Sequence, residues 1–133
     1  MSDKVFVSYH SSDEGTRYKN LLVAWSKNDN GYFDLKFDDL SIGVSINSDN
    51  ATYIKSKIKR RIEDCKTFVA LIDADYSDSD WCKWEDEKAV ELGKKIVVVK
   101  ISNTYTTPTE LLGVGAKFAM SFTYDAIKKA IDD

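Results

Sequence analysis

The residues best suited to chemistry lie in one short segment, Ser79-Asp80-Trp81-Cys82-Lys83-Trp84-Glu85, between two strongly apolar runs. Trp81 and Glu85 are four residues apart, so they share one face if a helix begins here, and Ser79 or the residue before it is a good N-cap. A carboxylate beside indole rings is partly desolvated and can still accept hydrogen bonds from the hydroxyl groups of a ligand. The plainer interpretation is that Trp81 and Trp84 are core residues and Glu85 is a solvated helix charge.

The elements that would position this segment alternate along the whole chain. Apolar runs predict strands at residues 4–9, 32–37, 67–72, 95–101 and 118–122. Helices are predicted after a capping box of Ser11 and Glu14, over the isoleucine repeat from Ile54 to Ile62, from Ser79 to Gly93, and over residues 124–131. Alternating helices and nearly solid apolar strands favour an α/β fold, a flavodoxin-like doubly wound parallel sheet of about five strands, in a single domain of residues 1–133.

In such a sheet, ligands bind beyond the carboxyl ends of the strands. The segments expected at that edge are residues 9–13, 38–50, 73–84 and 102–107. Glu85 falls on the first or second turn of the helix that leaves this edge. The fold therefore brings the unusual carboxylate to the place where a site is expected.

Five other side chains at this edge are candidates for ligand binding, and each has a plainer alternative. Tyr9 and His10 could stack on a ligand or donate to it, or Tyr9 packs and His10 is simply exposed. Asp39 and its neighbour Asp38 could bind ribose or diphosphate, although acidic pairs also cap turns. Trp84 could line a nicotinamide pocket or belong to the core.

Composition excludes several classes of function. The chain has a net charge of −3 and a pI near 5.2, which disfavours a nucleic-acid partner. No apolar run approaches the roughly 20 residues of a membrane span, residues 1–5 lack a signal-peptide layout, and the two cysteines have no paired spacing, so a cytoplasmic location is expected. The chain has a single histidine, which argues against a zinc site. It contains no phosphate-binding glycine motif, which argues against a dehydrogenase or an NTPase.

Several motifs resemble those of TIR domains. Residues 5–10, followed by Asp13, are similar to the first TIR strand and loop, and residues 37–40 with Gly43 to the second. The spacing of Ser79, Trp81, Cys82 and Glu85 matches the Ser-x-Trp-Cys-x-x-Glu signature in which TIR NADases carry their catalytic glutamate. Compact length, Tyr9-His10 and the tryptophan beside the glutamate most resemble the stand-alone ThsB-type TIR proteins of bacterial Thoeris anti-phage systems.

The resemblance implies an NAD⁺ glycohydrolase or cyclase that makes a cyclic ADP-ribose-type signal for a downstream effector. It further implies self-association through TIR surfaces and a phage-derived trigger, with NAD⁺ as substrate and neither a metal nor another cofactor. One carboxylate is enough for this chemistry, because nicotinamide leaves as a neutral base and needs no general acid. The implied catalytic residue is Glu85, and the substrate-binding candidates are Tyr9, His10, Asp39, Trp81 and Trp84.

Three alternatives remain at this stage. Attack by water instead of an intramolecular nucleophile would give linear ADP-ribose, a plain hydrolase activity. A non-catalytic TIR assembly module would not need Glu85. A receiver-like phosphoacceptor domain would need an acidic pair at the end of the first strand, where this chain has Ser8-Tyr9-His10.

Two departures from the TIR pattern bear on these alternatives. Asp86 stands where the residue after the glutamate is usually hydrophobic, which could tilt or solvate that helix turn. The polar loop at 41–50 lacks the proline of TIR adaptors that signal by assembly, which favours an enzyme.

Overall fold

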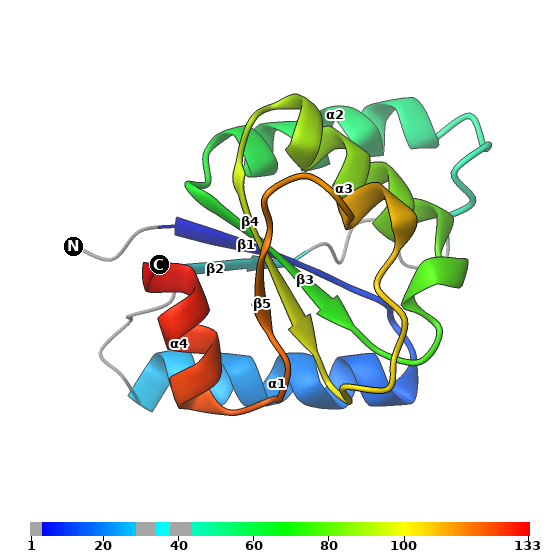
Figure 1. Ribbon diagram of the computed structural model, residues 1–133. Coiled ribbons are helices and arrows are strands. Elements are labelled where there is room, and N and C mark those ends of the chain that lie inside the picture. The colour runs from blue at the N-terminus through cyan, green and yellow to red at the C-terminus, as the bar shows by residue number, and fades with distance from the viewer. Residues whose placement is uncertain (1–3, 29–33, 38–43) are drawn as a thin grey trace.

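The computed structural model describes residues 4–28, 34–37 and 44–133 (Figure 1). The strands are β1 (Lys4–Tyr9), β2 (Asp34–Phe37), β3 (Thr67–Ile72), β4 (Lys95–Lys100) and β5 (Lys117–Ala119). The helices are α1 (Asp13–Asn28), α2 (Ala51–Glu63), α3 (Asp80–Glu91) and α4 (Tyr124–Asp132), with short 3₁₀ turns η1 (Tyr76–Asp78) and η2 (Thr109–Leu111).

The five strands form one parallel sheet in the order β2-β1-β3-β4-β5. This order is that of flavodoxin-like doubly wound sheets, as the alternating pattern predicts. Helices α2 and α3 cover one face and α1 and α4 the other (Figure 1). All strands point the same way, so their carboxyl ends share one edge.

The alternation of side chains along β1 divides its residues between two cores. Phe6 belongs to the core beneath α2 and α3, where its ring stacks on Phe68 at 5.6 Å between centroids. Val5, Val7 and Tyr9 belong to the core beneath α1 and α4. Ser8 has the parity of Phe6, so its hydroxyl faces α3, and it is completely buried.

Helix α3 has the ends that its sequence predicts. Ser79 is the N-cap, and its Oγ accepts a hydrogen bond from the Cys82 amide at 3.2 Å. At the other end Gly93 adopts φ +70°, and the Lys94 amide donates to the Ala89 carbonyl at 3.1 Å. This left-handed glycine and 6→1 bond form a Schellman-type end.

Some predicted bounds are wrong. Helix α1 is capped by Ser12 instead of Ser11, because the Ser12 Oγ accepts from the Gly15 amide at 3.0 Å. Strand β5 ends at Ala119, and Phe122 packs instead on Trp25, with ring centroids 5.0 Å apart. Residues 32 and 33 of the predicted second strand lie outside the described residues. Over the described ranges, no helix has the length and apolar character to cross a membrane.

Candidate functional site

Glu85 lies on the inner face of α3, and none of its surface is exposed. The Ser8 hydroxyl of β1 donates to Glu85 Oε1 at 2.6 Å. The distance is short for a hydrogen bond between two oxygens. The site therefore contains a buried carboxyl group that accepts a hydrogen bond from a hydroxyl of an internal strand of the sheet.

The Ser8 contact continues through two more buried side chains. Tyr76 Oη, from η1, lies 2.9 Å from Ser8 Oγ and 2.6 Å from Asp86 Oδ1. Burial, and then a carboxyl–carboxyl contact with Glu110, raise the pKa of Asp86 well above its usual range. The expectation that Asp86 solvates this helix turn is wrong, because the side chain is fully buried.

The two tryptophans of α3 have different environments. Trp81 is 9% exposed, and its Nε1 donates to the Val44 carbonyl at 2.7 Å, which ties the segment before α2 to the first turn of α3. Trp84 meets Trp81 edge-on at 6.2 Å between centroids and is half-buried. The ammonium groups of Lys55 and Lys88 lie 5.9 Å and 5.5 Å from the Trp84 ring centroid. A shallow hollow of about 300 Å³ adjoins this ring, lined by Ile46, Asn47, Asp80, Lys83, Trp84 and Glu87.

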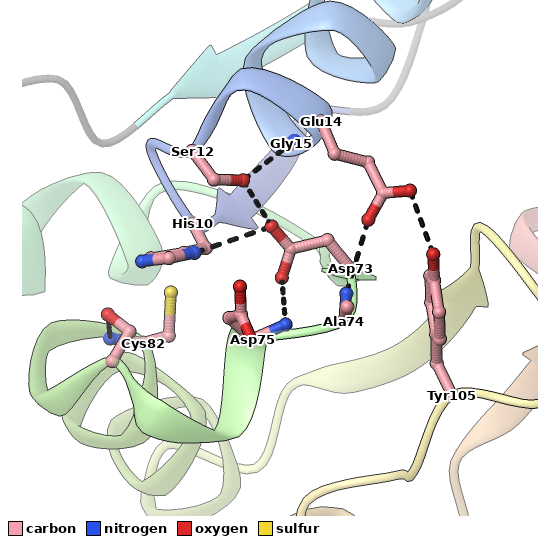
Figure 2. A network of polar contacts seen from close by, with 10 residues as sticks. His10, Ser12, Glu14, Gly15, Asp73, Ala74, Asp75, Cys82 and Tyr105 are labelled. Atoms are coloured by element: carbon pink, nitrogen blue, oxygen red, sulfur yellow. Dashed lines mark hydrogen bonds and ion pairs between the residues drawn. The ribbon is translucent and has the colours of Figure 1, made fainter.

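A second polar network joins β1, α1 and β3 at the carboxyl edge (Figure 2). Its centre is Asp73, 3% exposed, whose Oδ2 accepts from Ser12 Oγ at 2.5 Å and lies 3.3 Å from His10 Nδ1. Glu14 of α1 extends the network, because its carboxylate accepts hydrogen bonds from the Ala74 amide at 3.2 Å and from the Tyr105 hydroxyl at 2.8 Å. The network braces the loops at this edge.

The Cys82 side chain points toward His10 (Figure 2). Its thiol is buried and free of disulfide bonding. Burial, and then the charge of Glu85, raise the pKa of this thiol well above its ordinary value. Such a thiol is a poor nucleophile at neutral pH.

The structure brings together only some of the predicted site residues. Glu85 and Trp81 lie on the same face of α3, and Trp84 packs beside Trp81. His10 instead contacts Asp73 at the sheet edge. Tyr9 packs into the core on the opposite face of the sheet, with Lys19 Nζ 5.4 Å from its ring centroid. Asp39 lies outside the described residues.

Sequence reasoning missed the residues that contact Glu85 and His10. The sequence pattern includes Ser8 only in the TIR-like first strand and in the argument against a receiver domain, and it includes Tyr76 and Asp73 only in the edge segment 73–84. The parity of β1 is a signal that was available for Ser8, because it predicts opposite faces for Ser8 and Tyr9. In the part of the chain that the structure describes, no cluster of three His, Cys, Asp or Glu side chains could hold a metal ion.

Comparison with known families decides the assignment. Residues 6–106 match the family model of the Thoeris protein ThsB, TIR-like domain. The chain belongs to this ThsB TIR-like family. The matched residues include β1 from Phe6 onward, all of α3, and the side chains of both networks described above except Glu110.

Solved structures share the fold at low sequence identity. The CMP N-glycosidase BcmB of Clostridium botulinum superposes with a TM-score of 0.63 at 13% identity, over 98% of this chain and 99% of that one. A 2-deoxyribosyltransferase of Bacillus psychrosaccharolyticus gives 0.61 at 12% identity, over 78% and 77% of the two chains. A search of curated protein sequences finds no significant match. At these identities the two structures establish the α/β fold alone.

Proposed function

We propose that this ThsB-type domain cleaves the bond between nicotinamide and ribose in NAD⁺, with Glu85 as the catalytic residue. The observation that carries the proposal is the buried Glu85 carboxyl group, which accepts from Ser8 at 2.6 Å within the TIR signature segment. A carboxylate with only a structural role would be expected on the exposed face of the helix, because a charged group is costly to bury.

The chemistry requires one negative group next to the ribose. Nicotinamide leaves NAD⁺ as a neutral base, so positive charge develops on the ribose as the bond breaks. A carboxylate in a dry site stabilises that oxocarbenium charge more strongly than it would in water, and it can hold the ribose hydroxyls. The names of the two similar structures, an N-glycosidase and a deoxyribosyltransferase, accord with a fold suited to this class of bond.

Access to Glu85 requires movement. The side chain is fully covered, and ligand sites usually enclose their ligand only once it is bound. The Trp81–Val44 hydrogen bond holds the segment that precedes α2 against the first turn of α3. We infer that this segment moves when NAD⁺ binds, and that closure over the ribose then excludes water. Exclusion of water would favour intramolecular attack and a cyclic ADP-ribose-type product, whereas leakage would give ADP-ribose.

The test is the Glu85→Gln variant, which keeps an oxygen to accept from Ser8 and removes the charge. Nicotinamide release from NAD⁺ should fall by roughly 10²–10³. Products should be identified by mass spectrometry, with and without phage lysate as the trigger. Glu91→Gln is the matched control, because Glu91 is on the same helix with a side chain 66% exposed and should leave turnover unchanged. Wild-type turnover by Glu85→Gln would exclude the proposed role of this residue and favour a non-catalytic assembly module.

A further inference from the structure

Four buried side chains form a continuous chain of short polar contacts that ends in two carboxyl groups. The distances are 2.6 Å from Glu85 Oε1 to Ser8 Oγ, 2.9 Å from Ser8 Oγ to Tyr76 Oη, and 2.6 Å from Tyr76 Oη to Asp86 Oδ1. Each of the four residues is at most 1% exposed. Glu85 and Asp86 are neighbours in sequence, yet their polar connection runs through β1 and η1.

The number of available protons limits how these four side chains can be hydrogen-bonded. Each of its three contacts requires one proton between its two oxygens, but the Ser8 and Tyr76 hydroxyls carry only one each. The third proton must therefore belong to a carboxyl group. If Asp86 carries it, Asp86 donates to Tyr76, Tyr76 to Ser8, and Ser8 to the Glu85 carboxylate. If Glu85 carries it, every donor reverses and Asp86 is the carboxylate.

We propose that Glu85 and Asp86 share a single proton through Ser8 and Tyr76, and that it resides on Asp86, leaving Glu85 as the anion. This proposal rests on the proposed function in assigning that anion to NAD⁺ cleavage. Asp86 is then a positioning residue that acts through two hydroxyl groups. Transfer of one hydrogen across each contact moves one proton from Asp86 to Glu85 with no change in total charge.

The acidic neighbours of Asp86 favour the proton on that residue. The titratable groups near Asp86 are Tyr76 of η1, Cys82 and Glu87 of α3, and Glu110 of η2. Glu87 and Glu110 are acidic, so they oppose a second charge at Asp86. Burial raises the pKa of both the Tyr76 phenol and the Cys82 thiol, which keeps each protonated at neutral pH. The shared proton thus prevents two adjacent buried carboxylates, an arrangement that low dielectric makes costly.

Infrared spectroscopy tests the proton's position without any need for turnover. At neutral pH the wild-type protein should show the C=O band of a protonated carboxyl group, and the band should shift when aspartate is labelled with ¹³C. Asp86→Asn should remove the band, while Glu85→Gln and the exposed control Asp64→Asn should keep it. Absence of the band, or its persistence in Asp86→Asn, would overturn the proposal whether or not NAD⁺ is the substrate.

A second measurement tests the link through the hydroxyl groups. Tyr76→Phe should move the Asp86 band to higher frequency, since the acid loses its acceptor, whereas Tyr53→Phe, at a tyrosine 67% exposed, should not. In the pH profile of NAD⁺ cleavage, Tyr76→Phe should move the acidic limb upward by roughly one pH unit. If Tyr76→Phe does not fold, Ser8→Ala interrupts the same chain and should shift the limb the same way. If Tyr76→Phe leaves both the Asp86 band and the acidic limb of the pH profile unchanged, Tyr76 is only a packing residue and the proposed sharing of a proton through Ser8 and Tyr76 is wrong.

Discussion

Ser8 shows how one small residue determines the electrostatics of the site. The Ser8 hydroxyl, on the face of β1 toward α3, donates a hydrogen bond to Glu85 and places one polar group among the buried residues of this strand. Burying a donor or acceptor without a partner costs about 1–3 kcal/mol, so Ser8 and Glu85 each remove a penalty from the other. The pair explains why a buried strand of this sequence contains a serine.

The raised pKa of Asp86 has a consequence for stability. Its stabilising contribution as a protonated acid is fully present below the unfolded pKa, near 3.8, and is lost progressively as the pH rises toward the higher folded pKa. Over that window the unfolded chain binds fewer protons than the folded one, so wild-type stability should fall by at most about 1.4 kcal/mol per pH unit. Asp86→Asn cannot ionise and should lack this component.

Urea denaturation at several pH values between about 4 and 7 would measure the difference. We expect Asp86→Asn to gain stability relative to wild type as the pH rises, with Asp64→Asn as a control that follows wild type. Parallel curves for wild type and Asp86→Asn would show that Asp86 ionises normally in the folded protein.

How much of the site could be predicted from sequence depends on how far apart in the sequence the contacting residues lie. The local spacing of Trp81 and Glu85 was enough to predict that they share a helix face, and the fold class predicted that their helix begins at the carboxyl edge of the sheet. The burial of Asp86 was not predictable, because its partners Tyr76 and Glu110 come from separate turns that only the folded chain brings together. A polar residue inside a helix pattern is ordinarily a surface residue.

At the scale of elements, the order of strands and helices could be predicted almost completely. Strands β1 and β3 were predicted to the residue, since continuous apolar runs bounded by polar residues leave little freedom. The ends of β5 and α1 were not, because Phe122 is recruited to an aromatic cluster on α1 and the Ser12 hydroxyl replaces Ser11 at the cap. Such boundaries depend on tertiary packing that periodicity does not encode.

The first turn of α1 and its approach to the end of β1 depend on Gly15. A Cβ at this position would lie 2.0 Å from the His10 carbonyl oxygen and 3.1 Å from Asp73 Oδ2. Gly15→Ala should therefore displace the backbone that carries His10 and destabilise the fold by about 1–3 kcal/mol or more. Gly93→Ala is the comparison, because a Cβ there meets nothing within 4 Å and the cost is only that of φ +70°, about 1–2 kcal/mol.

Thermal melting of the two glycine variants would rank these effects. We expect the lower melting temperature for Gly15→Ala, together with weakening of the network around Asp73. Equal melting temperatures would show that the close approach at Gly15 relaxes without cost.

At the scale of the whole molecule, the described part of the chain combines a covered Glu85 carboxyl group with exposed apolar side chains at one edge of the sheet. Glu85 is fully buried, whereas Phe118 and Met120, in and just after β5, are 43% and 49% exposed. β5 is an edge strand of only three residues, and exposed apolar groups on an edge favour association. We propose that self-association at this edge opens the site.

We therefore predict that NAD⁺ cleavage rises more steeply than linearly with protein concentration. Nicotinamide release should be measured across a dilution series, with light scattering at each concentration to report the oligomeric state. Phe118→Lys should suppress the steep rise, because a charge on the exposed edge opposes pairing. Lys117→Arg, at the neighbouring position, keeps the edge charge and should behave as wild type. A strictly monomeric preparation that turns over NAD⁺ at full rate would contradict this prediction and would place the opening of the Glu85 site within a single chain.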